Sequence, residues 1–174
     1  MTDRKVKIKG IAPLLMHKTN VGQEEAGPAP TVYKAEDDAK KGAYYDKKIG
    51  MYVPSNAIEA CLREVGKKFR LKGKGKTTLK NTILASVFVQ EEKIPLKKKS
   101  WDEIDSRVAR IQRNQIVRHR PRFNSWELEF TISFDETQID EATMKALFDE
   151  AGKTQGILDY RPKFGRFEVI QFKK

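Results

Sequence analysis

Residues 107–135 read RVARIQRNQIVRHRPRFNSWELEFTISFD, and the second half of this stretch has the clearest pattern in the chain. From residue 126 onward, apolar and polar side chains alternate strictly. The apolar set is Trp126, Leu128, Phe130, Ile132 and Phe134. The polar set is Glu127, Glu129, Thr131 and Ser133. A period of two residues with one apolar face predicts a half-buried β-strand, on which we expect the rest of the fold to be built.

The first half, residues 107–122, is basic and contains no Asp or Glu. Its arginines are Arg107, Arg110, Arg113, Arg118, Arg120 and Arg122. Because large apolar residues are few and residues 121–125 have the composition of a turn, we expect a projecting hairpin or thumb within about residues 93–124. We expect its guanidinium groups to lack local acidic partners and to contact an anionic polymer; the alternative is an ordinary solvated hairpin.

The charge of the chain is concentrated in one third of its length. The 174 residues include 35 Lys and Arg against 24 Asp and Glu, a net charge of +11. Residues 62–122 hold 18 of these bases and six of the acids, which leaves a net charge of −1 for the rest. A segregated excess of this kind attracts and retains a polyanion. A membrane surface would also suit it, but the amphipathic helix that such binding requires is not predicted.

A second basic segment covers residues 67–80, which contain seven cations and no acid. Its candidate phosphate ligands are Lys67, Lys68, Arg70, Lys72, Lys74 and Lys76. A phosphate-binding P-loop is excluded, because Arg70 stands where the motif needs its first glycine and the segment follows a helix. We interpret it as a flexible, glycine-spaced loop that becomes ordered against its anion.

The remaining pattern predicts one α+β domain over residues 1–174. We expect further strands at residues 5–15, 82–90 and 166–172, the second of them buried at the centre of the sheet. With two helices between them, the order is strand, helix, strand, strand, helix, strand. This is the ferredoxin-like (RRM-like) split βαβ order. Residues 19–50 lack a period, and we expect them to form an inserted long loop or short hairpin.

Two helices are predicted from their caps and apolar stripes. The first follows residue 55, has Asn56 and Glu59 at capping-box spacing, extends to Phe69 and buries Cys61. The second begins after the cap residue Asp140 and ends at a glycine, residue 152.

The composition argues against several classes of protein. No stretch approaches the roughly 20 apolar residues of a membrane span, and the first residues lack a signal-peptide core, so we expect a cytoplasmic protein with no membrane contact. The single cysteine cannot form an internal disulfide. Together with only His17 and His119 it provides no ligand set at metal spacing. We therefore predict neither a metal nor a cofactor.

Residues 53–63, VPSNAIEACLR, resemble the first-helix motif of the RAMP superfamily, the ferredoxin-like CRISPR effector proteins, with Ser55 and Asn56 in place of the motif's glycine. Residues 152–165 resemble the glycine-rich loop of that superfamily, and residues 107–122 lie where its backbone subunits carry a thumb hairpin. Residues 14–17, 114–121 and 158–167 are similar to phage-encoded proteins of about this size. The resemblance implies a subunit that grips single-stranded DNA or RNA by its phosphates and stacks head to tail along it.

The residues themselves indicate binding through the basic loops. Glu127 and Glu129 would repel phosphate from the polar face of their strand, so stacking of bases on the open sheet is disfavoured and little sequence preference is expected. Two alternatives stay open. One is a metal-independent RAMP-type endoribonuclease with His17 or His119 as general acid or base. The other is a phage anti-defence protein that mimics a CRISPR subunit and binds protein.

Overall fold

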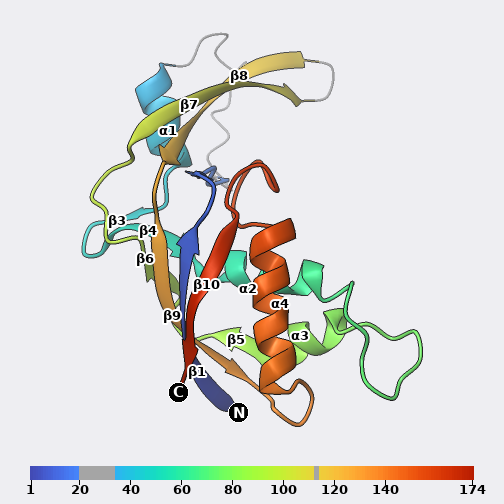
Figure 1. The fold of residues 1–174 in the computed structure, drawn as a ribbon. Helices are drawn as coiled ribbons and strands as arrows, with labels where there is room; N and C mark the ends of the chain where they lie inside the picture. The colour runs from blue at the N-terminus through green and yellow to red at the C-terminus, as the bar shows by residue number, and fades with distance from the viewer. Residues whose placement is uncertain (20–33, 112–113) are drawn as a thin grey trace.

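The computed structural model describes residues 1–19, 34–111 and 114–174. Its central element is a four-stranded sheet in the order β10-β1-β9-β5, in which all neighbours are antiparallel (Figure 1). The strands are β1 (Thr2–Gly10), β5 (Val87–Val89), β9 (Glu127–Phe134) and β10 (Phe167–Lys173). The protein is therefore of the α+β class, as predicted.

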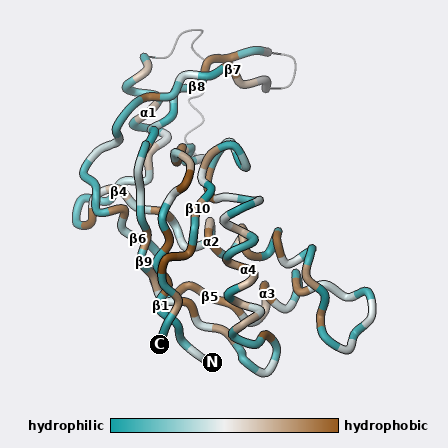
Figure 2. The backbone as a smooth tube through the Cα atoms, viewed as in Figure 1, coloured by the Kyte–Doolittle hydropathy of each residue, from teal (hydrophilic) through white to brown (hydrophobic). Residues whose placement is uncertain are grey.

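The helices α2 (Ser55–Val65), α3 (Lys80–Ser86) and α4 (Glu141–Thr154) lie together on one side of this sheet (Figure 1). Strand β9 buries Leu128, Phe130 and Ile132 toward the core that it shares with the helices. The ring centroids of Phe130 and Phe148 of α4 are 6.1 Å apart. Figure 2 shows hydrophobic stretches along the central strands. The predicted faces of β9 are confirmed.

A long hairpin extends beyond the central sheet (Figure 1). It consists of β7 (Glu103–Ile111) and β8 (Asn114–Phe123), and β2 (Leu14–Leu15) pairs with the base of β8. Helix α1 (Ala35–Gly42) lies against the hairpin, where Asp38 accepts a hydrogen bond from the backbone N–H of His119 at 2.8 Å. The projecting hairpin is confirmed, but residues 107–111 and 114–122 are strand and not loop.

A third, smaller sheet contains β3 (Tyr45–Asp46), β4 (Gly50–Pro54) and β6 (Lys93–Pro95). The second half of the insertion expected at residues 19–50 contains α1, which was not predicted, and β3, which forms a short hairpin with β4. Residues 20–33 of that predicted insertion lie outside the described residues.

The strand predicted at residues 82–90 is wrong. Residues 80–86 form α3, and only the last part of the segment forms a strand, β5, at the edge of the sheet. Ile83 is buried whereas Leu84 is 58% exposed, as expected of a helix with one face on the core. A short apolar run does not distinguish a strand from a helix by its period, which explains the error.

Two details of the helices also differ from prediction. Helix α2 ends at Val65, and Glu59 does not complete a capping box: its Oε1 accepts a hydrogen bond from the backbone N–H of Val89 at 2.9 Å. Helix α4 continues past Gly152 to Thr154, and a Cβ at Gly152 would overlap the carbonyl oxygen of Phe167. Gly152 therefore lets α4 approach β10 closely instead of ending the helix. The cap by Asp140 and the burial of Cys61 are confirmed.

Candidate nucleic-acid interface

The β7–β8 hairpin places four of the six predicted arginines on one face. Its register sets Arg107 opposite Arg118, Asp105 opposite Arg120 and Glu103 opposite Arg122. Because side chains alternate between the faces of a strand, these six residues share one face. We call Arg107, Arg118, Arg120 and Arg122 the arginine face. Arg113 lies outside the described residues, and the backbone of Arg110 pairs with that of Gln115.

Three of these arginines pair with an acid, and for Arg107 the acid is local in sequence, so the expectation of no local partner is wrong there. Arg107 donates through Nε to Asp105 Oδ1 at 2.6 Å and through Nη2 to Oδ2 at 3.0 Å, and this hydrogen bonding raises the pKa of Arg107. Arg120 pairs with Asp159, and Arg122 lies 3.8 Å from Glu103. Arg118 makes no ion pair within the part of the chain that the structure describes. It is thus the cation of the arginine face that remains available to a ligand.

Residues 155–166, the loop after α4, carry two aromatic rings to the arginine face. The Arg107 guanidinium carbon lies 5.3 Å from the Tyr160 ring centroid and 4.9 Å from that of Phe164. The Arg120 guanidinium carbon lies 5.9 Å from the Tyr160 centroid. These are cation–π distances. Phe164 is buried, whereas Tyr160 is 44% exposed, so its ring retains surface for a ligand.

The backbone of this loop has unusual conformations that fix the aromatic rings. Leu158 and Tyr160 have φ values of 61° and 57°, in the left-handed region that residues other than glycine seldom adopt. The loop is anchored where Asp159 N–H donates to the Leu15 carbonyl at 3.2 Å and Gly165 N–H donates to that of Pro13 at 2.8 Å. Strained residues of this kind cluster at functional sites. Sequence reasoning found the glycine spacing of the loop but did not single out Tyr160.

The two histidines lie in different surroundings. Burial lowers the pKa of His17, nearby Arg118 lowers it further, and Asp159 opposes both effects. His119 belongs to the opposite face of the hairpin, where its Nδ1 lies 2.7 Å from Ser106 Oγ. His17 is therefore the histidine whose pKa is influenced by the arginine face.

The second predicted basic segment does not join the first. In Figure 1 the loop after α2 (green, right) is well separated from the β7–β8 hairpin (top). Lys67 pairs with Glu64, and the Nζ atoms of Lys68 and Lys72 lie 2.8 Å from Glu150 and 2.6 Å from Asp140.

The other three cations of this loop are differently placed. Arg70 forms a backbone bridge with Thr78. Lys74 and Lys76 are exposed and make no ion pair among the described residues. Those predicted ligands whose side chains the structure describes therefore lie on two separate surfaces of one copy of the chain.

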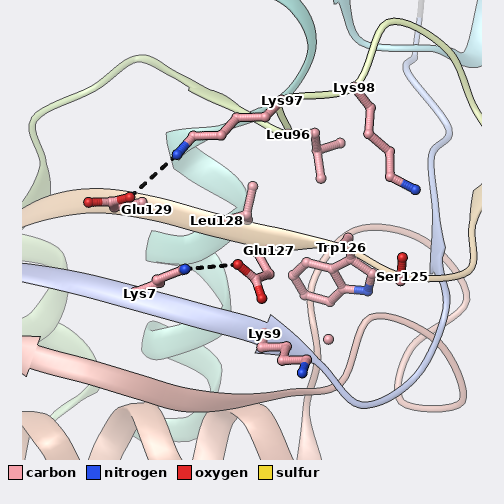
Figure 3. A pocket seen from close by; sticks show the side chains of 11 residues that line it. Lys7, Lys9, Leu96, Lys97, Lys98, Ser125, Trp126, Glu127, Leu128 and Glu129 are labelled. Carbon is pink, nitrogen blue, oxygen red and sulfur yellow. Dashed lines mark hydrogen bonds and ion pairs between the residues drawn. The ribbon is translucent and has the colours of Figure 1, made fainter.

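A cavity of about 380 Å³ opens on the polar face of the sheet, beside residues 96–98 (Figure 3). Four lysines and two glutamates line it, and both glutamates are paired: Lys7 Nζ lies 2.9 Å from Glu127 and Lys97 Nζ lies 3.5 Å from Glu129. The indole N–H of Trp126 donates to the Ala12 carbonyl at 2.8 Å, so it is not available to a ligand. That phosphate does not bind on this face therefore stays a prediction.

The described residues offer neither a candidate metal-ligand group nor a reactive thiol. They contain no group of three or more His, Cys, Asp or Glu side chains that could hold a metal ion. Burial raises the pKa of the Cys61 thiol to about 12, so it is not a reactive thiolate. Among the helices described, none is long and apolar enough to cross a membrane.

Comparison with models of known protein families gives no match for this chain, and comparison with curated proteins gives none either. What the protein does is therefore inferred from its own residues.

Proposed function

We propose that the protein binds single-stranded nucleic acid without sequence preference, and that Tyr160 and the arginine face make the principal contact. The observation that carries this proposal is the exposed Tyr160, which two guanidinium groups flank. Arg118, opposite Arg107, makes no ion pair among the described residues. Arg161 and Lys163 are exposed in the same loop. Aromatic rings that stack on bases, surrounded by cations that meet phosphates, are typical of sites for single strands.

The same features favour a single strand over a duplex. A base can stack on Tyr160 only when it is free of its partner strand, as in single-stranded loops and ends. The carboxylates of Asp105 and Asp159 are already occupied by arginines, which leaves them poorly placed to read base edges. Phosphate contacts and stacking carry little sequence information, so affinity is expected to be similar across sequences.

We infer further that the central sheet with α2 and α4 is a ferredoxin-like split βαβ. The strand order β10-β1-β9-β5 supports this inference, with α2 among the three helices described between β1 and β5 and α4 between β9 and β10. The resemblance to RAMP-superfamily backbone subunits suggests head-to-tail assembly. The separation of the lysine loop from the hairpin supports it, because neighbouring copies would contact one strand with different surfaces.

Fluorescence anisotropy with labelled DNA and RNA of mixed sequence tests the proposed function. We expect binding at low salt that weakens steeply as salt is added. Each phosphate contact should add roughly 0.7 to the slope of the logarithm of the binding constant against the logarithm of the salt concentration. Tyr160→Ala should weaken binding, whereas Tyr160→Phe, which keeps the ring, should not. Equal affinity of Tyr160→Ala and the wild type, or no binding at low salt, would contradict the proposal. The latter result would favour the protein-binding alternative.

A metal-independent ribonuclease is the second candidate function, favoured by the position of His17. A histidine with a lowered pKa is neutral at pH 7 and can accept a proton as a general base. The positive charges of Arg118 and Arg120 nearby would stabilise the negative charge that develops on the phosphorus centre during cleavage. Labelled RNA incubated with EDTA tests this function. Cleavage by the wild type and by His119→Ala but not by His17→Ala would establish it, and intact RNA in all three would exclude it.

A further inference from the structure

A second cavity, of about 370 Å³, lies between the β3–β4 turn and residues 97–99. Five lysines line it, namely Lys47, Lys48, Lys97, Lys98 and Lys99. The two segments are held together, because the backbone N–H of Met51 donates to the Lys98 carbonyl at 3.0 Å. Gly50, with a φ of 80°, permits this approach, since a Cβ there would lie 2.9 Å from the same oxygen. The lysines are thus brought together by a fixed backbone.

The carboxylates near this cavity, those of Asp46, Asp102 and Glu129, already pair with lysines. Asp46 accepts hydrogen bonds from Lys93 Nζ at 2.7 Å and from the backbone N–H of Lys48 at 2.8 Å. Lys98 Nζ lies 2.8 Å from Asp102, and Lys97 is the lysine that reaches Glu129 in Figure 3.

The three remaining lysines, Lys47, Lys48 and Lys99, are exposed and make no ion pair with any residue that the structure describes. Their positive charge is therefore available to an anion.

An exposed aromatic ring lies among these lysines. Tyr45 is 54% exposed, whereas its neighbour Tyr44 is half-buried and packs against Tyr52 with ring centroids 5.7 Å apart. Tyr44 therefore belongs to the packing of the sheet, and Tyr45 is left at the surface. Of the four tyrosines described, Tyr45 and Tyr160 are the exposed ones, and both lie beside cations.

We propose that this cavity is a second contact for the same nucleic-acid strand, with Lys47, Lys48 and Lys99 meeting phosphates and Tyr45 stacking on a base. The inference rests on the proposed function and extends the path of the strand beyond Tyr160. The two contacts are connected through the backbone, because Lys98 pairs with Asp102, whose backbone N–H donates to the carbonyl of Arg122 of the arginine face at 2.9 Å. A positively charged path with spaced aromatic rings is how proteins bind extended single strands.

Oligonucleotides of increasing length test the second contact by anisotropy. The variant Lys47→Ala, Lys48→Ala, Lys99→Ala should bind strands of about four nucleotides like the wild type, because such strands occupy only the Tyr160 contact. The triple variant should bind strands of about 16 nucleotides more weakly than the wild type does, and its salt slope should be smaller by roughly 2. Tyr45→Ala should lose roughly tenfold in affinity for the long strand alone. The matched control for charge removes Lys145, Lys153 and Lys173, and Phe88→Ala is the control for an exposed ring.

The outcomes separate this inference from the proposed function. If the triple variant binds long strands with unchanged affinity and slope while Tyr160→Ala is impaired, the second contact is overturned and the proposed function stands. If the charge control loses as much affinity as the triple variant, the effect is one of net charge, which also overturns the contact. If the wild type binds no strand of any length, both proposals fail.

Discussion

Arg118 lies directly opposite Arg107 in the β7–β8 hairpin, and within the described ranges only Arg107 of the two is held by a carboxylate, that of Asp105. Like charges directly opposite each other destabilise a strand pair. The hairpin thus contains a charge arrangement that an anion would relieve. This relationship connects the fold to the proposed function, because the same face carries the guanidinium groups that flank Tyr160.

Replacing Arg118 should separate binding from stability. Arg118→Ala removes a cation that has no ion-pair partner among the described residues, so nucleic-acid binding should weaken for all sequences and the salt slope should fall by roughly 0.7. The free energy of unfolding should stay the same or rise by a few tenths of a kcal/mol, because the like-charge pair is removed. Thermal denaturation with parallel anisotropy measures both. A clear loss of thermal stability would mean that Arg118 has a structural role.

The pKa of His17 should respond to changes at the arginine face. Burial and Arg118 lower the pKa of His17, so Arg118→Ala should raise it toward the ordinary value of about 6.5. Bound phosphate should raise it as well. Because the pKa is lowered in the folded state, His17 should reduce stability as the pH falls below about 6.5, and His17→Gln should lessen that loss. NMR titration of the ring proton measures the pKa, and the same value with and without oligonucleotide would place the strand elsewhere.

The cap of α4 should determine part of the acid sensitivity. Hydrogen bonds from Lys72 and from the backbone N–H of Thr143 lower the pKa of Asp140 to about 2. The stabilising contribution is present above the ordinary carboxyl pKa of about 3.9 and is lost as the pH falls toward 2. Asp140→Ala should cost about 1 kcal/mol at neutral pH. The difference from the wild type in urea denaturation should shrink between pH 4 and pH 2, and a constant difference would contradict this account.

The sequence predicted those elements whose pattern is local. Strand β9 and the apolar stripe of α4 follow from periodicity, and the Asp140 cap follows from residues three apart. Helix α3 was missed because seven residues are too few to establish a helical period.

The candidate site was only half predictable. The basic hairpin was found from charge, but Arg120 pairs with an acid 39 residues away, and such a partner depends on the tertiary fold. Tyr160 likewise became notable only through its left-handed backbone and the guanidinium groups around it. The separation of the two basic segments is a property of the whole topology, which charge counting along a chain does not reveal.

The close contact of α4 with β10 should depend on Gly152. In Gly152→Ala the new Cβ would meet the backbone carbonyl of Phe167, which cannot move as a side chain can. We expect a loss of roughly 1–3 kcal/mol in the free energy of unfolding. Denaturant unfolding measures it, with Lys145→Ala on the exposed side of the same helix as the control. Equal stability of Gly152→Ala and wild type would show that the helix shifts without cost.

The lysine loop should matter only for long strands. The loop after α2, which carries Lys74 and Lys76, lies well apart from the β7–β8 hairpin on one copy of the chain (Figure 1). Replacing both with Ala should leave affinity for strands of about four nucleotides unchanged and weaken binding to strands long enough for several copies. Light scattering on the complexes gives the number of copies per strand. One copy per strand at every length would argue against head-to-tail assembly.

Photocrosslinking tests the central claim most directly, since it reads the contact itself. A single-stranded oligonucleotide carrying 5-iodouracil is bound at low salt, irradiated and mapped by mass spectrometry. We predict a cross-link to Tyr160, because a base stacked on that ring places its reactive carbon against it. The cross-link should disappear in Tyr160→Ala, while Phe88→Ala should retain it. Cross-links confined to residues 67–80, or to the polar face of β9, would contradict the assignment of Tyr160 and the arginine face as the principal contact.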